Sequence, residues 1–207
     1  MHMRKNLLAV LVAGFLGMPA LAGAQAPAAS EEGLARGLML SHEGRMIFSP
    51  CRERSYVEVE DVSPGGVVTS ALKKLGLSAD KPLYAELFGE ADNGTLRTKG
   101  INFAHVQARC GAPLPGTGPW RAVGRNPAWS MITAEDKLRL HVEGHPAAEV
   151  SFTENLDDPA VTRLEVEGGQ WELRQQVCFH PDNRLLSGWA ITGEFRGKAL
   201  NGCAWKP

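Results

Sequence analysis

The sequence lacks the features that mark several common classes of protein. Its 22 lysines and arginines are balanced by 23 acidic residues, and no basic run or basic face is present. Nucleic-acid-binding proteins normally show such a basic patch, so we predict no nucleic-acid partner. The longest apolar run, residues 7–18, is shorter than the about 20 residues of a membrane-spanning helix. We therefore expect no membrane span in the mature chain.

Sequence motifs of catalytic and metal sites are also missing. The chain has no G-x-S-x-G elbow for a serine nucleophile and no closely spaced cysteine pair for a metal. The segment GEFRGKA, residues 193–199, has neither the spacing nor the hydroxyl residue of a phosphate-binding loop. His141 and His145 lie four residues apart, but the neighbouring Gly144 and Pro146 place His145 in a turn. We predict no catalytic residue, no cofactor and no metal ligand.

The N-terminal segment is typical of a secretory signal peptide. Arg4 and Lys5 precede the apolar run, and Ala22-Gly23-Ala24 follows as a cleavage signal. We expect residues 1–24 to be removed by cleavage near Ala24, and residues 25–32 to form a polar tether. The mature protein is then periplasmic or secreted.

Four cysteines lie in the part of the chain that we expect to be exported: Cys51, Cys110, Cys178 and Cys203. An even number in an oxidising compartment predicts disulfide bonds. Of the three possible pairings we expect Cys51–Cys110 and Cys178–Cys203, because each pair then falls within one segment. Cys203 would fasten the last strand, and Trp205 would cover the end of the core.

A stretch rich in proline and glycine, residues 110–120, divides the mature chain. We interpret residues 33–111 as one β module, residues 112–119 as a linker and residues 120–207 as a second β module.

The first module combines short strands with one helix. Residues 56–60 alternate in polarity with the period of a half-buried strand, and Asn93-Gly94 is typical of a tight hairpin turn. The segment VVTSALKKLGL predicts a helix that begins with Thr69 or Ser70 as N-cap and ends at Gly76. A helix between the third and fourth of five strands favours an oligonucleotide/oligosaccharide-binding (OB) type of barrel.

The second module contains eight strand-like segments separated by turn residues every eight to twelve positions. This spacing predicts a small antiparallel eight-stranded β-barrel, which leaves no open sheet edge. All five tryptophans lie in this module, and we expect them to fill its core. Trp129 stands beside the turn at Asn126-Pro127, where it would line a barrel mouth. The predicted fold is therefore mainly β.

Two segments of the second module resemble a family of bacterial envelope proteins of largely unknown function. RAVGRNPAWSM resembles the family's ARGNEPFW opening, and Cys178, Gly202, Cys203 and Ala204 match its closing segment, which ends in GCA. Asn126 and Ala128 replace the glutamate and phenylalanine of that opening. The resemblance implies a small envelope β-barrel of the META/HslJ type or of the membrane-bound lysozyme inhibitors.

The first module is similar to the OB-type domain of the envelope-stress lipoprotein NlpE. The segments that carry this similarity are GRMIFSPCRERSYVEV and PLYAELFG.

From these patterns we expect a non-enzymatic periplasmic protein that binds an envelope protein or a small ligand and acts in envelope stress or homeostasis. Two alternatives stay open. One is an inhibitor of an envelope-active hydrolase such as lysozyme, and the other is a hydrolase whose site the sequence does not reveal. The candidate binding residues lie in the segments RNPAW and HPDNR: Arg125, Asn126, Trp129, His180 and Asn183.

Overall fold

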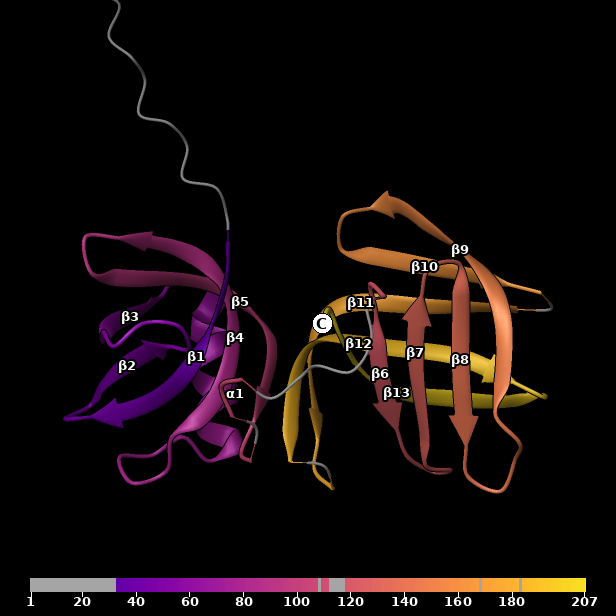
Figure 1. The fold of residues 1–207 in the computed structure, drawn as a ribbon, viewed down its shortest axis with the longest axis horizontal. Coiled ribbons are helices and arrows are strands. Elements are labelled where there is room, and N and C mark those ends of the chain that lie inside the picture. The colour runs from indigo at the N-terminus through magenta and orange to yellow at the C-terminus, as the bar shows by residue number, and fades with distance from the viewer. Residues whose placement is uncertain (1–32, 108, 112–117, 168, 183) are drawn as a thin grey trace, which may run out of the picture. The chain divides into compact units, whose positions relative to one another are not determined.

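The computed structural model describes residues 33–107, 109–111, 118–167, 169–182 and 184–207. Thirteen strands and one α-helix are found in this part of the chain, so the predicted mainly β fold is confirmed (Figure 1). The expected signal peptide, the tether, Asn183 and residues 112–117 of the expected linker lie outside the described residues.

The first barrel is a closed ring of five strands. Strand β1 pairs with β2 and β4, β2 pairs with β3, and β5 closes the ring by pairing with β4 and, in parallel, with β3. The helix lies between β3 and β4 in the sequence, as predicted. The strands are β1 Gly33–His42, β2 Arg45–Pro50, β3 Val57–Asp61, β4 Leu83–Asp92 and β5 Thr95–His105.

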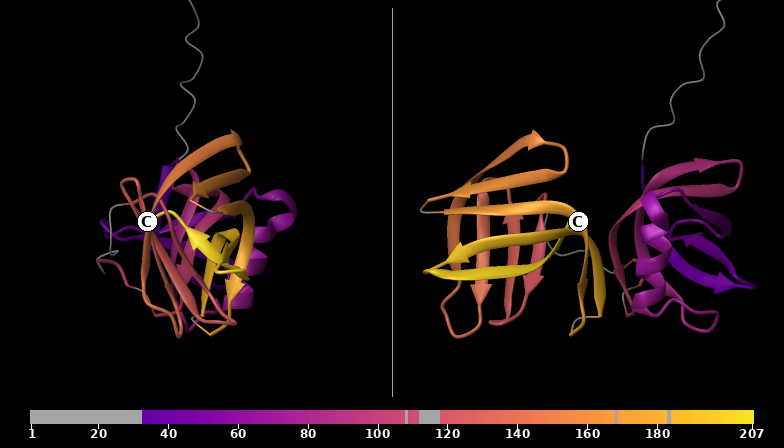
Figure 2. Two further views of the ribbon diagram at one scale, coloured as in Figure 1. Left: turned by 90° about the vertical axis from the view of Figure 1, so that its right-hand side faces the viewer. Right: turned by 180° about the vertical axis from the view of Figure 1, so that it is seen from behind.

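Helix α1, Val67–Leu75, packs one face against the core of this barrel (Figure 2). Its buried residues follow the spacing of an amphipathic helix: Val68, Ala71, Leu72 and Leu75. The helix ends at Gly76, which has a φ of 115°, a conformation that glycine adopts without strain. That part of the prediction is confirmed.

The predicted N-cap was wrong. Thr69 and Ser70 lie inside the helix, and Gly66 occupies the N-cap position. Side chains further upstream accept the free N–H groups instead: Thr69 donates to Asp61 Oδ2 at 2.7 Å, and Val68 donates to Ser63 Oγ at 3.2 Å. The short 3-10 helix Pro64–Gly66 turns the chain so that these side chains reach the helix.

We expect Asp61→Asn to lower the free energy of unfolding by about 0.5–1 kcal/mol at neutral pH, because the amide loses both the negative charge at the helix N-terminus and one acceptor oxygen. Burial opposes ionisation of Asp61, but hydrogen bonds from Ser63 and Thr69 outweigh it and hold its pKa below the ordinary value. The stabilisation is therefore present above the unfolded-state pKa and is lost as pH falls through the lower folded-state pKa. Urea unfolding at neutral and strongly acidic pH measures this. A difference between variant and wild type that stays constant with pH would contradict it, and exposed Asp80→Asn is the control.

The second barrel contains all eight predicted strands. Each strand pairs antiparallel with the next one in sequence, and β13 pairs with β6 to close the ring. The predicted antiparallel eight-stranded barrel is therefore confirmed, and its topology is up-and-down. The strands are β6 Arg121–Gly124, β7 Trp129–Ala134, β8 Lys137–Val142, β9 Ala148–Asp158, β10 Val161–Val166, β11 Gly169–His180, β12 Leu185–Phe195 and β13 Lys198–Trp205.

Tryptophan side chains dominate the core of the second barrel. Trp120 and Trp189 meet edge to face with ring centroids 5.0 Å apart, and Trp129 and Trp171 lie 5.4 Å apart. All four are at least 94% buried. Trp205 differs from the prediction, because it packs on Phe103 of β5 at 5.0 Å and not on this core.

Both predicted disulfide bonds are present. Cys51 and Cys110 are joined within the first barrel, and Cys178 of β11 is joined to Cys203 of β13. The second bond ties the last strand to the sheet, as expected. The described residues form one compact unit, in which β12 pairs antiparallel with β5 over three residues of each strand.

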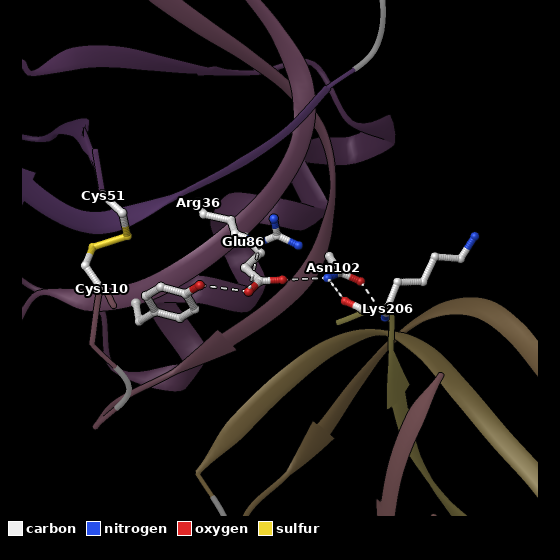
Figure 3. Close-up of polar contacts among 7 residues, drawn as sticks. Arg36, Cys51, Glu86, Asn102, Cys110 and Lys206 are labelled. Atoms are coloured by element: carbon white, nitrogen blue, oxygen red, sulfur yellow. Dashed lines mark hydrogen bonds and ion pairs between the residues drawn. A yellow bond between two sulfur atoms is a disulfide. The ribbon is translucent and has the colours of Figure 1, made fainter. Parts of the chain in front are cut away.

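A buried polar network also connects β4 and β5 to the C-terminal tail (Figure 3). Glu86 is fully buried and accepts hydrogen bonds from the Tyr84 hydroxyl at 2.8 Å and from the Asn102 amide at 2.6 Å. Arg36 lies 3.5 Å from the same carboxylate. Asn102 also donates to the Lys206 carbonyl and accepts from the Lys206 N–H. Burial and the neighbouring Glu86 raise the pKa of Tyr84 above its ordinary value, so the hydroxyl keeps its proton.

Candidate functional site

The two segments chosen from the sequence as binding loops line one hollow of about 510 Å³. One segment is the turn between β6 and β7, and the other is the turn between β11 and β12. Arg125 and Asp182 connect them: Arg125 Nη1 lies 3.3 and 3.4 Å from the two carboxylate oxygens of Asp182. These residues are 57 positions apart in the sequence. The sequence therefore identifies each loop by itself, and only the fold shows that the two loops meet.

The structure places the five predicted residues differently. Arg125, Trp129 and His180 line the hollow. Asn126 is exposed in the same turn, with a φ of 63°, and Asn183 lies outside the described residues. Trp129 is only 4% exposed, and its indole N–H donates to the Asn201 carbonyl at 3.2 Å. It therefore forms part of the wall and of the barrel core at once.

The residues predicted from the sequence did not include four polar residues of this hollow: Ser130, His141, Glu143 and Asp182. Ser130 and His141 face each other across β7 and β8. Strand alternation in AWSMITA and KLRLHVE places both on the outer face, but only the register of the two strands shows that they meet. The hollow thus contains hydroxyl, imidazole, carboxylate and guanidinium groups, which can form hydrogen bonds to a polar ligand.

A second hollow of about 520 Å³ continues from the first, because Val123 and Asp182 line both. It lies where β12 pairs with β5, and its walls include Phe103, His105 and Trp205. Phe103 stands between the other two rings, 6.2 Å from His105 and 5.0 Å from Trp205. Trp205 is only partly buried. We call the two hollows together the joint groove; one end is polar and the other is lined by aromatic rings.

No group of three or more His, Cys, Asp or Glu residues that could hold a metal ion is found among the described residues. In the same part of the chain, no helix combines the length and apolar character that crossing a membrane requires.

Comparison with protein families, with curated proteins and with solved structures finds no match for this chain. The geometry of the joint groove is therefore the basis for a functional assignment.

Proposed function

We propose that the protein is an exported, non-enzymatic binding protein of the cell envelope, and that it holds a saccharide-containing ligand in the joint groove. The signal-peptide pattern and the two disulfide bonds support export. The binding assignment rests on one observation: the two hollows are continuous. The ion pair of Arg125 and Asp182 therefore lies next to the packed rings of Phe103 and Trp205.

The side chains of the groove suit recognition of a polar ring-shaped molecule. Ligand sites combine apolar walls with a few polar groups that fix orientation. Here the exposed part of Trp205 offers a flat apolar surface, while Arg184, Asp182 and His141 offer hydrogen-bonding groups along the groove. A saccharide has hydroxyl groups along its edge and C–H groups on its face, so it complements both kinds of surface.

We expect soluble peptidoglycan fragments to bind, and Asp182→Arg to weaken this binding by at least about tenfold, which corresponds to loss of roughly one charge-assisted contact. The change reverses the charge at the point shared by the two hollows and breaks the pair with Arg125. Isothermal titration calorimetry measures the affinity. The matched control is Asp136→Arg, which makes the same change in the exposed turn between β7 and β8. If both variants bound the fragments with equal affinity, the joint groove would not be the binding site.

A second candidate function is inhibition of a cell-wall hydrolase such as lysozyme. One observation favours it: the exposed residues Arg125, Asn126 and Asp182 sit on two turns that an ion pair holds together. Loops fixed before binding lose less conformational entropy when they enter an enzyme's cleft. The test is lysozyme-catalysed lysis of a cell-wall suspension with added protein. Inhibition that Arg125→Glu abolishes would support this function, and unchanged lysis would exclude it.

A further inference from the structure

One end of the second barrel leaves its core uncovered. Val150, Val166 and Phe195 pack at the edge of the core and are only partly buried. They line a cavity of about 280 Å³, to which Leu140 and the deeply buried Trp171 also contribute. This cavity lies where the β10–β11 and β12–β13 hairpins turn, and we call it the barrel mouth.

The opposite end of the barrel is closed. Trp120 lies just before β6, and the Lys206 ammonium group just beyond β13 lies 5.0 Å from the centroid of its ring and 5.6 Å from that of Trp189. The core is therefore covered by aromatic rings and a cation at one end and open to solvent at the other. Apolar side chains left facing a cavity at a barrel mouth are typical of a ligand site.

Charged groups stand at the rim of the barrel mouth. Glu167 and Glu194 line it, and neither takes part in an ion pair among the described residues. The rim also contains Arg196, whose guanidinium group lies over the Phe195 ring at 5.2 Å. Two carboxylates against one guanidinium leave the rim with net negative charge, which favours a cationic head group.

We propose that the barrel mouth binds a short aliphatic chain that carries an ammonium head group. The chain replaces water against Val150, Val166 and Trp171, and the head group lies between Glu167 and Glu194. The volume of about 280 Å³ lies just below the range for small-molecule sites, about 300–1,000 Å³, so one short chain fits and a two-chain lipid does not. The barrel mouth shares no lining residue with the joint groove, so this proposal is independent of the proposed function.

Isothermal titration calorimetry with three probes below their micellar concentrations tests this. Decylammonium has both parts of the ligand, decyl sulfate has the chain with the opposite charge, and tetramethylammonium has the head group alone. We expect decylammonium to bind at least about tenfold more tightly than either of the others, because each of them loses one of the two contributions. Equal binding of decyl sulfate, or absence of decylammonium binding, would overturn the proposal.

Variants locate the site. Glu167→Gln combined with Glu194→Gln keeps the apolar cavity and removes the rim charge, so decylammonium should bind about tenfold more weakly. Glu165→Gln, on the outer face of β10, is the matched control. Val166→Phe fills the cavity and should abolish binding in protein that melts as wild type. If that variant does not fold, the double variant of Glu167 and Glu194, whose side chains are exposed, tests the proposal by itself. Unchanged affinity in the glutamate pair, or loss of affinity in Asp182→Arg of the joint groove, would place the probe elsewhere and refute the assignment.

Discussion

Gly202→Ala is expected to destabilise the protein by about 3 kcal/mol or more, at the upper end of the cost of overpacking a core. A Cβ atom at this position would lie 2.2 Å from the Val123 carbonyl oxygen and 2.7 Å from Cζ2 of Trp129. The first of these atoms belongs to the backbone of the neighbouring strand β6, so it cannot move without disturbing the pairing of β6 with β13. Such a change lowers the melting temperature by roughly 6–12 °C in a chain of this length.

The control is Gly169→Ala, in the same barrel. The nearest atom to a Cβ there is Val166 Cγ2 at 4.0 Å, which is an ordinary contact, so we expect a change within about 0.5 kcal/mol. Thermal unfolding followed by circular dichroism compares the two variants. Equal melting temperatures would show that β6 and β13 can separate to admit a methyl group.

The same contact joins the first and last segments of the second barrel, which lie far apart in the sequence. Trp129 stands in the opening segment and Gly202 in the closing one, and the structure places the indole ring against Gly202 and also against Gly124. A large ring can lie across two neighbouring strands only where both lack side chains on that face. The tryptophan and the distant glycine therefore form one packing unit. Their contact supports the fold and carries no information about function.

Much of the fold could be predicted because its signals are local. Strand alternation and turn residues define the eight strands of the second barrel, and the segment boundaries favoured the observed cysteine pairing. The helix start could not be found in this way. Thr69 and Ser70 are residue types that often cap helices. Here Asp61 and Ser63, which lie before the helix, accept the N–H groups of its first turn instead.

The buried network could not be predicted from local pattern. Residues Leu83–Leu87 are buried on both faces of β4, so strand alternation does not show that Glu86 is enclosed. Its partner Asn102 meets Lys206, which is 104 positions away in the sequence. The joint groove is similar: each turn is recognisable by itself, but the Arg125–Asp182 contact depends on how the barrel closes.

This network changes what the C-terminal tail is expected to contribute. From the sequence, loss of the Cys178–Cys203 bond is expected to cost about 2–5 kcal/mol. The structure gives the tail two further anchors, Trp205 on Phe103 and the Lys206 backbone on Asn102. We therefore expect both Cys203→Ala and truncation after Ala204 to destabilise the protein substantially.

For the truncation the expected loss is about 3 kcal/mol or more. Removing Trp205 exposes apolar surface worth about 1.5–3 kcal/mol. Removing Lys206 leaves the Asn102 side chain without two of its hydrogen-bond partners in a buried site, at about 1–3 kcal/mol. Urea unfolding of the oxidised protein measures the sum. A truncated chain as stable as wild type would show that neither anchor matters.

A double-mutant cycle separates the two anchors. Asn102→Ala in the full-length chain removes the bonds to both Glu86 and Lys206. In the truncated chain the same change removes only the bond to Glu86, so it should cost less, and the two changes should couple by about 0.5–3 kcal/mol. Asn201→Ala is the control, because that side chain is exposed on β13 and should not couple to the truncation. If the effects of Asn102→Ala and truncation simply add, the tail is held by Trp205 alone and the clamp on Lys206 contributes nothing to stability.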